Sequence, residues 1–134
     1  MRIGKLAVED TKMLFESNLK SLKRVRQGKI RDIYEVDSSH WLIVTSDRLS
    51  AFDVVLPDPI PKKGAVLTTV SNFWFDQFSS KVKNHLSKLS LEEVISDEKE
   101  REVLNGRSVI VHKLKALPFE AIVRGYVIGS GWKE

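Results

Sequence analysis

The chain has 134 residues, of which 42% are apolar and 30% charged, and it contains no cysteine. This balance suits one domain of ordinary size, with room for the start of a second, and it excludes a wholly disordered chain. Without cysteine there is no disulfide, thiolate nucleophile or cysteine metal site. The apolar runs are too short for a membrane span and the N-terminus lacks the apolar stretch of a secretory signal, so we expect a cytoplasmic protein.

The net charge of +4 is concentrated at the start of the chain. Residues 1–35 hold nine Lys or Arg against five Asp or Glu, whereas the remaining residues hold thirteen of each. The excess peaks between Lys20 and Arg31 and has two interpretations, an anion-binding site or a solvated basic edge.

Three short strands open the predicted fold. Residues 22–26, 29–36 and 41–45 have strand character, and turn signals separate them at Gln27-Gly28 and at residues 37–39. This order predicts an antiparallel meander. Ahead of it the chain predicts only a short, weak helix or a mobile lead-in.

A loop and a long helix follow. Prolines at alternate positions forbid a helix or a central strand within residues 46–64, which predicts an ordered loop. Apolar residues then recur at three- and four-residue steps over residues 66–82, which predicts a helix. Its apolar stripe, expected to pack in the core, comprises Val66, Val70, Phe73, Trp74, Phe78 and Val82.

The last third of the chain predicts two short helices and two strands. Ser90-Leu91-Glu92-Glu93 is a capping box that begins one helix, and residues 97–102 predict the other. Residues 107–114 and 120–128 have strand patterns, and Gly129-Ser130-Gly131 is typical of a helix start. The fold class is therefore α+β, an antiparallel sheet with a packed helix.

The first segment with candidate chemistry is the glycine turn at Gly28. Alternate residues of a strand share a face, so Lys29 and Arg31 are expected to point the same way just after the turn. Such a turn with two cations can hold the phosphates of a nucleotide. A solvated hairpin edge is the alternative, because the Walker pattern is absent.

Two further segments concentrate polar groups. Residues 45–53 include Ser50 and Asp53 and can present donors and acceptors to a ligand, or can form a turn capped by its own side chains. Arg124 interrupts an apolar strand pattern, and Ser130 lies at a predicted helix start, so the pair suits an anion. Arg124 can instead pair with a carboxylate such as Glu120. The three histidines, His40, His85 and His112, show no metal-ligand spacing.

These segments, taken in order, resemble a known family. GKIRDIYE, TSDRLSAFD with LPDPIPKKG, SNFWFD and LPFEAIVRGYVIGSGWKE are similar to SAICAR synthetase, and the resemblance runs over about residues 22–134. Members of that family join L-aspartate to the carboxylate of 5-amino-4-carboxyimidazole ribonucleotide with ATP and magnesium. The resemblance implies a small lobe like that of protein kinases over residues 1–117. Residues 118–134 would begin a larger, ATP-grasp-like lobe that binds substrates.

The resemblance also implies roles for residues. Gly28, Lys29 and Arg31 would bind the triphosphate of ATP, and the backbone of Ala116 and Leu117 would hold adenine. Ser50, Asp53, Arg124 and Ser130 would bind the substrates. No catalytic residue or metal ligand is assigned, since the magnesium-binding carboxylates of the family would lie beyond residue 134. We therefore expect a truncated N-terminal piece, inactive alone.

Two other functions use the same features. The Lys20–Arg31 patch could serve a nucleic-acid-binding module, with Tyr34 and Trp41 stacking on bases, although no RNA-binding signature is present. A catalytically silent nucleotide-binding lobe is the other alternative. The apolar residues within 119–134 predict that this segment is frayed, rearranged or buried against a second copy of the chain.

Overall fold

The computed structural model describes residues 12–119 and 121–132. A four-stranded antiparallel sheet has the order β1-β2-β3-β6, and a two-stranded ribbon pairs β4 with β5. The strands are β1 (Lys23–Gln27), β2 (Arg31–Glu35), β3 (His40–Thr45), β4 (Ser50–Ala51), β5 (Val54–Val55) and β6 (Ser108–His112). The helices are α1 (Lys63–Phe78), α2 (Leu91–Val94), α3 (Glu98–Leu104) and the 3-10 turn η1 (Gly129–Trp132).

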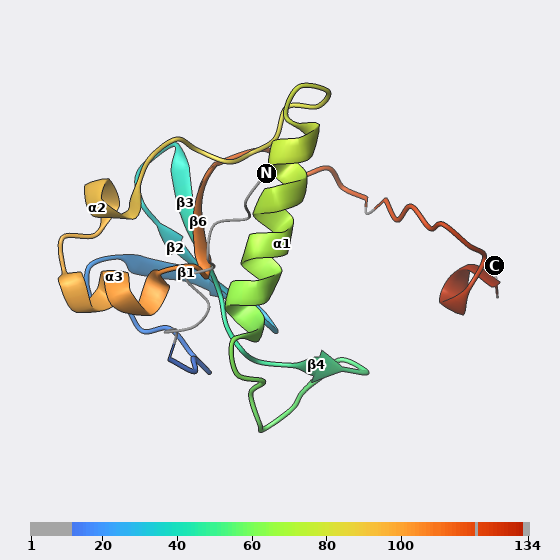
Figure 1. Ribbon diagram of the computed structural model, residues 1–134, viewed down its shortest axis with the longest axis horizontal. Coiled ribbons are helices and arrows are strands. Elements are labelled where there is room, and N and C mark those ends of the chain that lie inside the picture. Colours follow the sequence, from blue (N-terminus) through green and yellow to red (C-terminus); the bar gives the residue numbers. More distant parts are fainter. Residues whose placement is uncertain (1–11, 120, 133–134) are drawn as a thin grey trace.

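The meander predicted for β1, β2 and β3 is confirmed, and β6 adds to its far edge. Facing pairs such as Tyr34 with Leu42 and Ile33 with Ile43 alternate along the ladder, so the sheet has two distinct faces. Helices α2 and α3 cover one face, and α1 crosses the other (Figure 1). The α+β class with an antiparallel sheet is therefore correct.

The main hydrophobic core lies between the sheet and α3. Its buried members come from the lead-in, the strands and the α2–α3 region: Leu19, Tyr34, Leu42, Val44, Ile95, Leu104 and Ile110. The described part of the lead-in has no helix, and it packs against the sheet with Ser17 and Leu19 buried. The weak helix allowed by the sequence is therefore absent from residues 12–20.

Helix α1 forms where the periodicity predicted a helix, but the predicted orientation of its stripe is wrong. Phe73, Trp74 and Phe78 are 39%, 53% and 48% exposed. The buried face instead carries Gly64, Ala65 and Thr68. Small residues let the helix approach the sheet closely, and periodicity locates an apolar stripe without showing what covers it.

The boundaries of the loop and the short helices follow local chemistry. Residues 46–62 are mostly loop, as predicted, with the β4–β5 ribbon as an added feature whose tip residues Phe52 and Asp53 have positive φ. The capping box is confirmed, because the Ser90 N–H donates to the Glu93 carboxylate at 2.6 Å. The Asp97 carboxylate caps α3 by accepting from the Glu100 N–H.

The strand predicted over residues 120–128 is wrong. Residues 121–128 contain no strand, and the chain runs away from the sheet after β6 to end near η1 (Figure 1). A strand needs a hydrogen-bonded neighbour, and none of the described strands lies alongside this segment. Its large apolar side chains are exposed: Phe119, Ile122, Val123, Tyr126, Val127, Ile128 and Trp132.

Candidate functional site

The glycine turn connects β1 to β2. The Gly28 N–H donates to the Arg31 carbonyl at 2.7 Å, closing a tight loop around Lys29 and Ile30. A Cβ at position 28 would lie 3.1 Å from that same carbonyl oxygen, which is why glycine suits the position. The turn thus holds the backbone of residues 28–31 in one compact arrangement.

Lys29 does not share a strand face with Arg31, because it precedes β2. Its ammonium instead forms an ion pair with Asp53 at the tip of the β4–β5 ribbon, with Nζ 2.5 Å from Oδ1. The hydrogen bond from Lys29 lowers the pKa of the Asp53 carboxyl below its ordinary value. The structure therefore brings together two residues for which the family resemblance implies different ligands, ATP for Lys29 and the substrates for Asp53.

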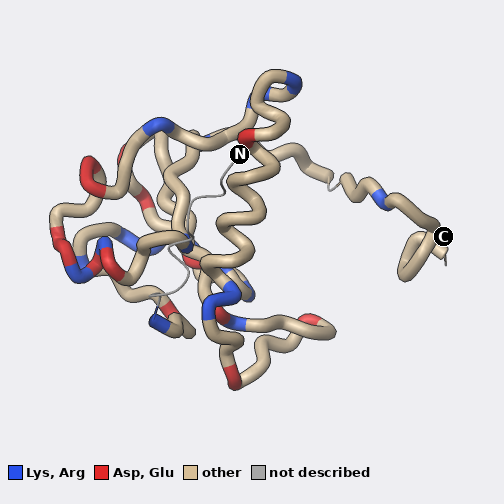
Figure 2. The backbone as a smooth tube through the Cα atoms, in the orientation of Figure 1, with Lys and Arg blue, Asp and Glu red and all other residues tan. Residues whose placement is uncertain are grey.

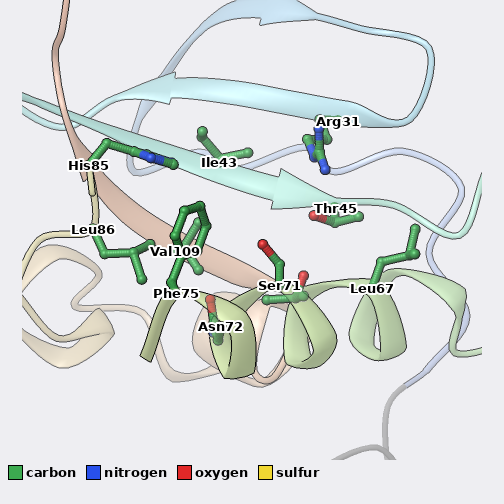
Figure 3. A pocket seen from close by; sticks show the side chains of 11 residues that line it. Arg31, Ile43, Thr45, Leu67, Ser71, Asn72, Phe75, His85, Leu86 and Val109 are labelled. Atoms are coloured by element: carbon green, nitrogen blue, oxygen red, sulfur yellow. The ribbon is translucent and has the colours of Figure 1, made fainter. Parts of the chain in front are cut away.

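Arg31 projects into a pocket of about 250 Å³ between the sheet and α1 (Figure 3). Thr45 on the neighbouring strand and Ser71 and Asn72 on α1 add hydroxyl and amide groups to the lining. His85 lies at the other end of the pocket in this view, and burial lowers its pKa. The rest of the lining is mainly apolar, so the pocket combines polar groups with hydrophobic side chains.

The start of α1 adds another cation. Burial lowers the pKa of the Lys63 ammonium, the positive charge of Arg31 acts in the same direction, and Asp47 opposes both. The Lys63 Nζ donates to the Arg48 carbonyl at 3.0 Å. Figure 2 shows Lys and Arg gathered where α1 begins, beside the turn. This concentration of positive charge suits an anion.

Residues 46–48 face inward, so the turn interpretation holds for this part of the polar segment. Asp47 is fully buried and accepts hydrogen bonds from the Leu14 N–H, the Gly64 N–H and the Arg107 guanidinium at 2.7, 2.8 and 2.9 Å. Of the segment, Ser50 lies half-buried in β4 and Asp53 is exposed. Residues 46–48 are therefore closed to a ligand, whereas the residues after Arg48 are open to one.

A second buried ion pair lies beneath the glycine turn. The Arg48 guanidinium donates to the Asp32 carboxylate at 2.8 Å, and the other carboxylate oxygen accepts from the Ser17 hydroxyl at 2.6 Å. No motif considered above predicts this pair. The signal was available, because strand alternation places Asp32 on the same face as Tyr34, where a buried carboxylate requires a partner.

The remaining predicted site residues lie after β6. Ala116 and Leu117 are in an exposed, irregular stretch. Arg124 donates to the Ser130 hydroxyl at 2.8 Å and to the Ile128 carbonyl at 3.2 Å, so these two predicted substrate residues are in contact. They lie in the extended tail, away from the glycine turn (Figure 1). Glu120, the alternative partner of Arg124, is outside the described residues.

The described residues contain no group of three or more His, Asp or Glu side chains that could hold a metal ion. The rings of His40 and His112 instead lie against each other, with centroids 4.8 Å apart and planes tilted by 44°, and His85 packs edge-on against Phe75. None of the helices described is long and apolar enough to cross a bilayer.

The two aromatic residues proposed to stack on bases differ in their exposure. Tyr34 is only 1% exposed, and its hydroxyl donates to the Ser17 carbonyl. Trp41 is partly buried, and the Lys113 ammonium lies 3.9 Å from the centroid of its ring. Tyr34 is therefore unable to stack on a base, which removes one of the two aromatic residues that this alternative used.

The fold defines the chain as an α+β lobe with an antiparallel sheet and a cationic turn at one end. Comparison with protein families then identifies it more closely, because the model of the SAICAR synthetase family matches residues 24–134. The chain belongs to the SAICAR synthetase family.

Curated relatives and solved structures agree. The chain is 60% identical over 121 residues to the phosphoribosylaminoimidazole-succinocarboxamide synthase of Methylococcus capsulatus, covering 90% of this chain and 41% of that protein. The Dechloromonas aromatica synthase is 59% identical, with 92% and 40% covered. The structure of the Saccharomyces cerevisiae SAICAR synthase complexed with SAICAR superposes with a TM-score of 0.79 at 42% identity, covering 92% of this chain and 43% of that one. The chain thus spans about two fifths of these relatives.

Proposed function

We propose that the chain is the N-terminal part of an ATP-dependent carbon–nitrogen ligase of purine biosynthesis. The ligase would condense L-aspartate with 5-amino-4-carboxyimidazole ribonucleotide to give SAICAR, ADP and phosphate. Residues 1–117 would form the small lobe over ATP, similar to the small lobe of protein kinases. Residues 118–134 would begin the ATP-grasp-like lobe that binds the substrates.

The observation that carries this proposal is the cationic turn. Lys29 lies in the glycine turn, Arg31 begins β2 and projects into the pocket, and Lys63 begins α1. A triphosphate carries several negative charges, and its binding needs cations held in fixed positions. These residues therefore fit a nucleotide, with Gly28 giving the backbone close access and Ala116 and Leu117 meeting the adenine.

The chemistry calls for positioning and charge neutralisation. The carboxylate of the ribonucleotide accepts the terminal phosphoryl group of ATP, and the aspartate amine then displaces phosphate as the new C–N bond forms. Lys29 and Arg31 would stabilise negative charge on the phosphates. Magnesium would supply further charge neutralisation, and we assign none of its ligands to the described residues.

On the substrate side, the contact between Arg124 and Ser130 supports a common role for the two. A guanidinium beside a hydroxyl can bind the phosphate of the ribonucleotide through several hydrogen bonds. Ser50 and Asp53 would approach the substrate carboxylate and amine. Lys29 already pairs with Asp53. The binding of ATP to Lys29 and of substrate to Asp53 would therefore each act on the same ion pair.

The test uses a protein in which the chain is continued by the remaining part of the Methylococcus capsulatus relative. We expect SAICAR formation that depends on ATP, magnesium and aspartate. Lys29→Ala should lower kcat/KM for ATP by about tenfold to a hundredfold, the effect of one charged hydrogen bond. Lys88→Ala, at an exposed lysine in the loop before α2, is the matched control and should have no effect.

Arg124→Leu in the same protein should weaken the ribonucleotide and leave ATP affinity unchanged. If both ligands weaken equally, Arg124 has a structural role. The 134-residue chain alone should give no turnover. ATP binding without turnover in the continued protein would favour a catalytically silent nucleotide-binding lobe, and unchanged kinetics in Lys29→Ala would remove Lys29 from the site.

A further inference from the structure

Three consecutive carbonyl groups of the glycine turn are held by residues that are not part of the turn. The Gly28 carbonyl accepts from Arg48 Nη2 at 3.0 Å, and the Lys29 carbonyl accepts from Arg48 Nε at 3.0 Å. The Ile30 carbonyl accepts from both the N–H and the hydroxyl of Ser46, at 2.9 Å each. All three carbonyls therefore point toward the buried segment 46–48.

Arg48 is itself fixed on every side. Its side chain is 4% exposed, and it pairs with the Asp32 carboxylate, which is fully buried. Its third nitrogen, Nη1, donates to the Phe15 carbonyl at 2.7 Å. Its own carbonyl accepts from Lys63, at the start of α1. The guanidinium is thus a rigid planar support between the turn, the lead-in and the helix.

This arrangement matters to an anion above the turn. A carbonyl oxygen carries partial negative charge and would repel a phosphate, whereas backbone N–H groups attract one. Drawing the three carbonyls inward removes that repulsion and fixes the backbone from which Lys29 and Arg31 project. A side chain that never meets the nucleotide can in this way set the geometry of the residues that do.

We propose that Arg48 is a positioning residue for the phosphate-binding turn, and that it acts by holding the Gly28 and Lys29 carbonyls away from the nucleotide. That the ligand is a nucleotide rests on the proposed function. That Arg48 holds the turn rests on the structure alone. Arg48→Lys keeps the positive charge opposite Asp32 but loses the planar fork, and with it the hydrogen bonds to the turn and to the Phe15 carbonyl.

The first measurement is amide hydrogen exchange in the 134-residue chain. The Gly28 N–H should exchange about tenfold faster in Arg48→Lys, relative to the amides of β3, because the turn loses the two hydrogen bonds that Arg48 donates to it. Arg107→Lys is the matched control. Arg107 is a second buried arginine paired with an aspartate, but it donates to Asp47 and to the Lys12 carbonyl and not to the turn. In Arg107→Lys, the exchange rate of the Gly28 N–H relative to the amides of β3 should stay unchanged.

The second measurement is ATP affinity, by titration calorimetry of the same variants at a temperature where each is folded. Arg48→Lys should weaken ATP about tenfold and add little when Lys29→Ala is already present, since Arg48 acts through Lys29. Arg107→Lys should leave ATP affinity unchanged. A merely structural role would give additive effects and would affect both arginines alike.

The outcomes separate the two proposals. An equal exchange ratio in Arg48→Lys and Arg107→Lys overturns the role of Arg48, whatever the nucleotide does. Unchanged ATP affinity in Lys29→Ala counts against the proposed function, and the exchange ratio then decides on Arg48 alone. Should Arg48→Lys fail to fold, Arg48→Gln combined with Asp32→Asn removes both charges together, and the same ratio is measured.

Discussion

Replacing Asp47 with alanine should be among the most destabilising single changes in the chain. The carboxylate is fully buried and accepts from the Arg107 guanidinium and from the backbone N–H groups of Leu14 and Gly64. Without it Arg107 stays buried with its charge unpaired, and Arg107 Nε already has no hydrogen-bond partner among the described residues. The lead-in and the start of α1 would also lose their common anchor.

The cost follows from the burial. Breaking a buried ion pair by removing one partner costs about 3–5 kcal/mol. A domain of this size has a total stability of about 5–15 kcal/mol, so Asp47→Ala removes a large share of it. The corresponding fall in Tm is about 10–20 °C.

Urea unfolding followed by circular dichroism measures this change. Glu16→Gln is the control, because Glu16 forms a solvent-exposed ion pair with Arg24 and its loss should leave the midpoint unchanged within error. Adding Arg107→Met to Asp47→Ala should recover part of the loss, since the unpaired charge is gone. A loss below about 1 kcal/mol in Asp47→Ala would refute the reasoning that this pair anchors three segments.

Three other predictions concern packing and charge. Gly64→Ala should destabilise the chain by about 1–3 kcal/mol or more in the same urea assay, because its Cβ would lie 2.3 Å from a backbone carbonyl oxygen, whereas Gly125→Ala meets nothing within 4 Å and should be tolerated. Trp74→Ser should leave the urea midpoint nearly unchanged, because Trp74 is 53% exposed; a large loss would show that α1 is covered in solution. The pKa of Asp53, followed by NMR titration, should lie below 3.8 and return toward it in Lys29→Ala. Because that pKa is depressed in the folded state, any stability from the pair is present above pH 3.8 and is lost as the pH falls through the folded value, and an unshifted pKa would contradict the ion pair.

Local chemistry was sufficient to place most elements. The turn signals, the capping box at Ser90 and the periodicity of residues 66–82 each depend on neighbours close in sequence, and the structure has an element at each. The strand predicted over residues 120–128 is wrong because an apolar run forms a strand only when a second strand lies beside it. Helix α1 shows the same dependence on neighbours. Periodicity located its apolar stripe correctly, but the stripe was predicted to be buried and is largely exposed.

The candidate site likewise has features that local sequence predicts and contacts that depend on the fold. A glycine turn with nearby cations follows from local sequence, since Gly28, Lys29 and Arg31 are neighbours in the chain. The contact of Lys29 with Asp53 and the support of the turn by Arg48 follow only from the folded arrangement, because these contacts join residues 24 and 19 or 20 positions apart. Such contacts depend on how strands and loops pack together, and no periodicity or local propensity encodes the partner of a buried charge.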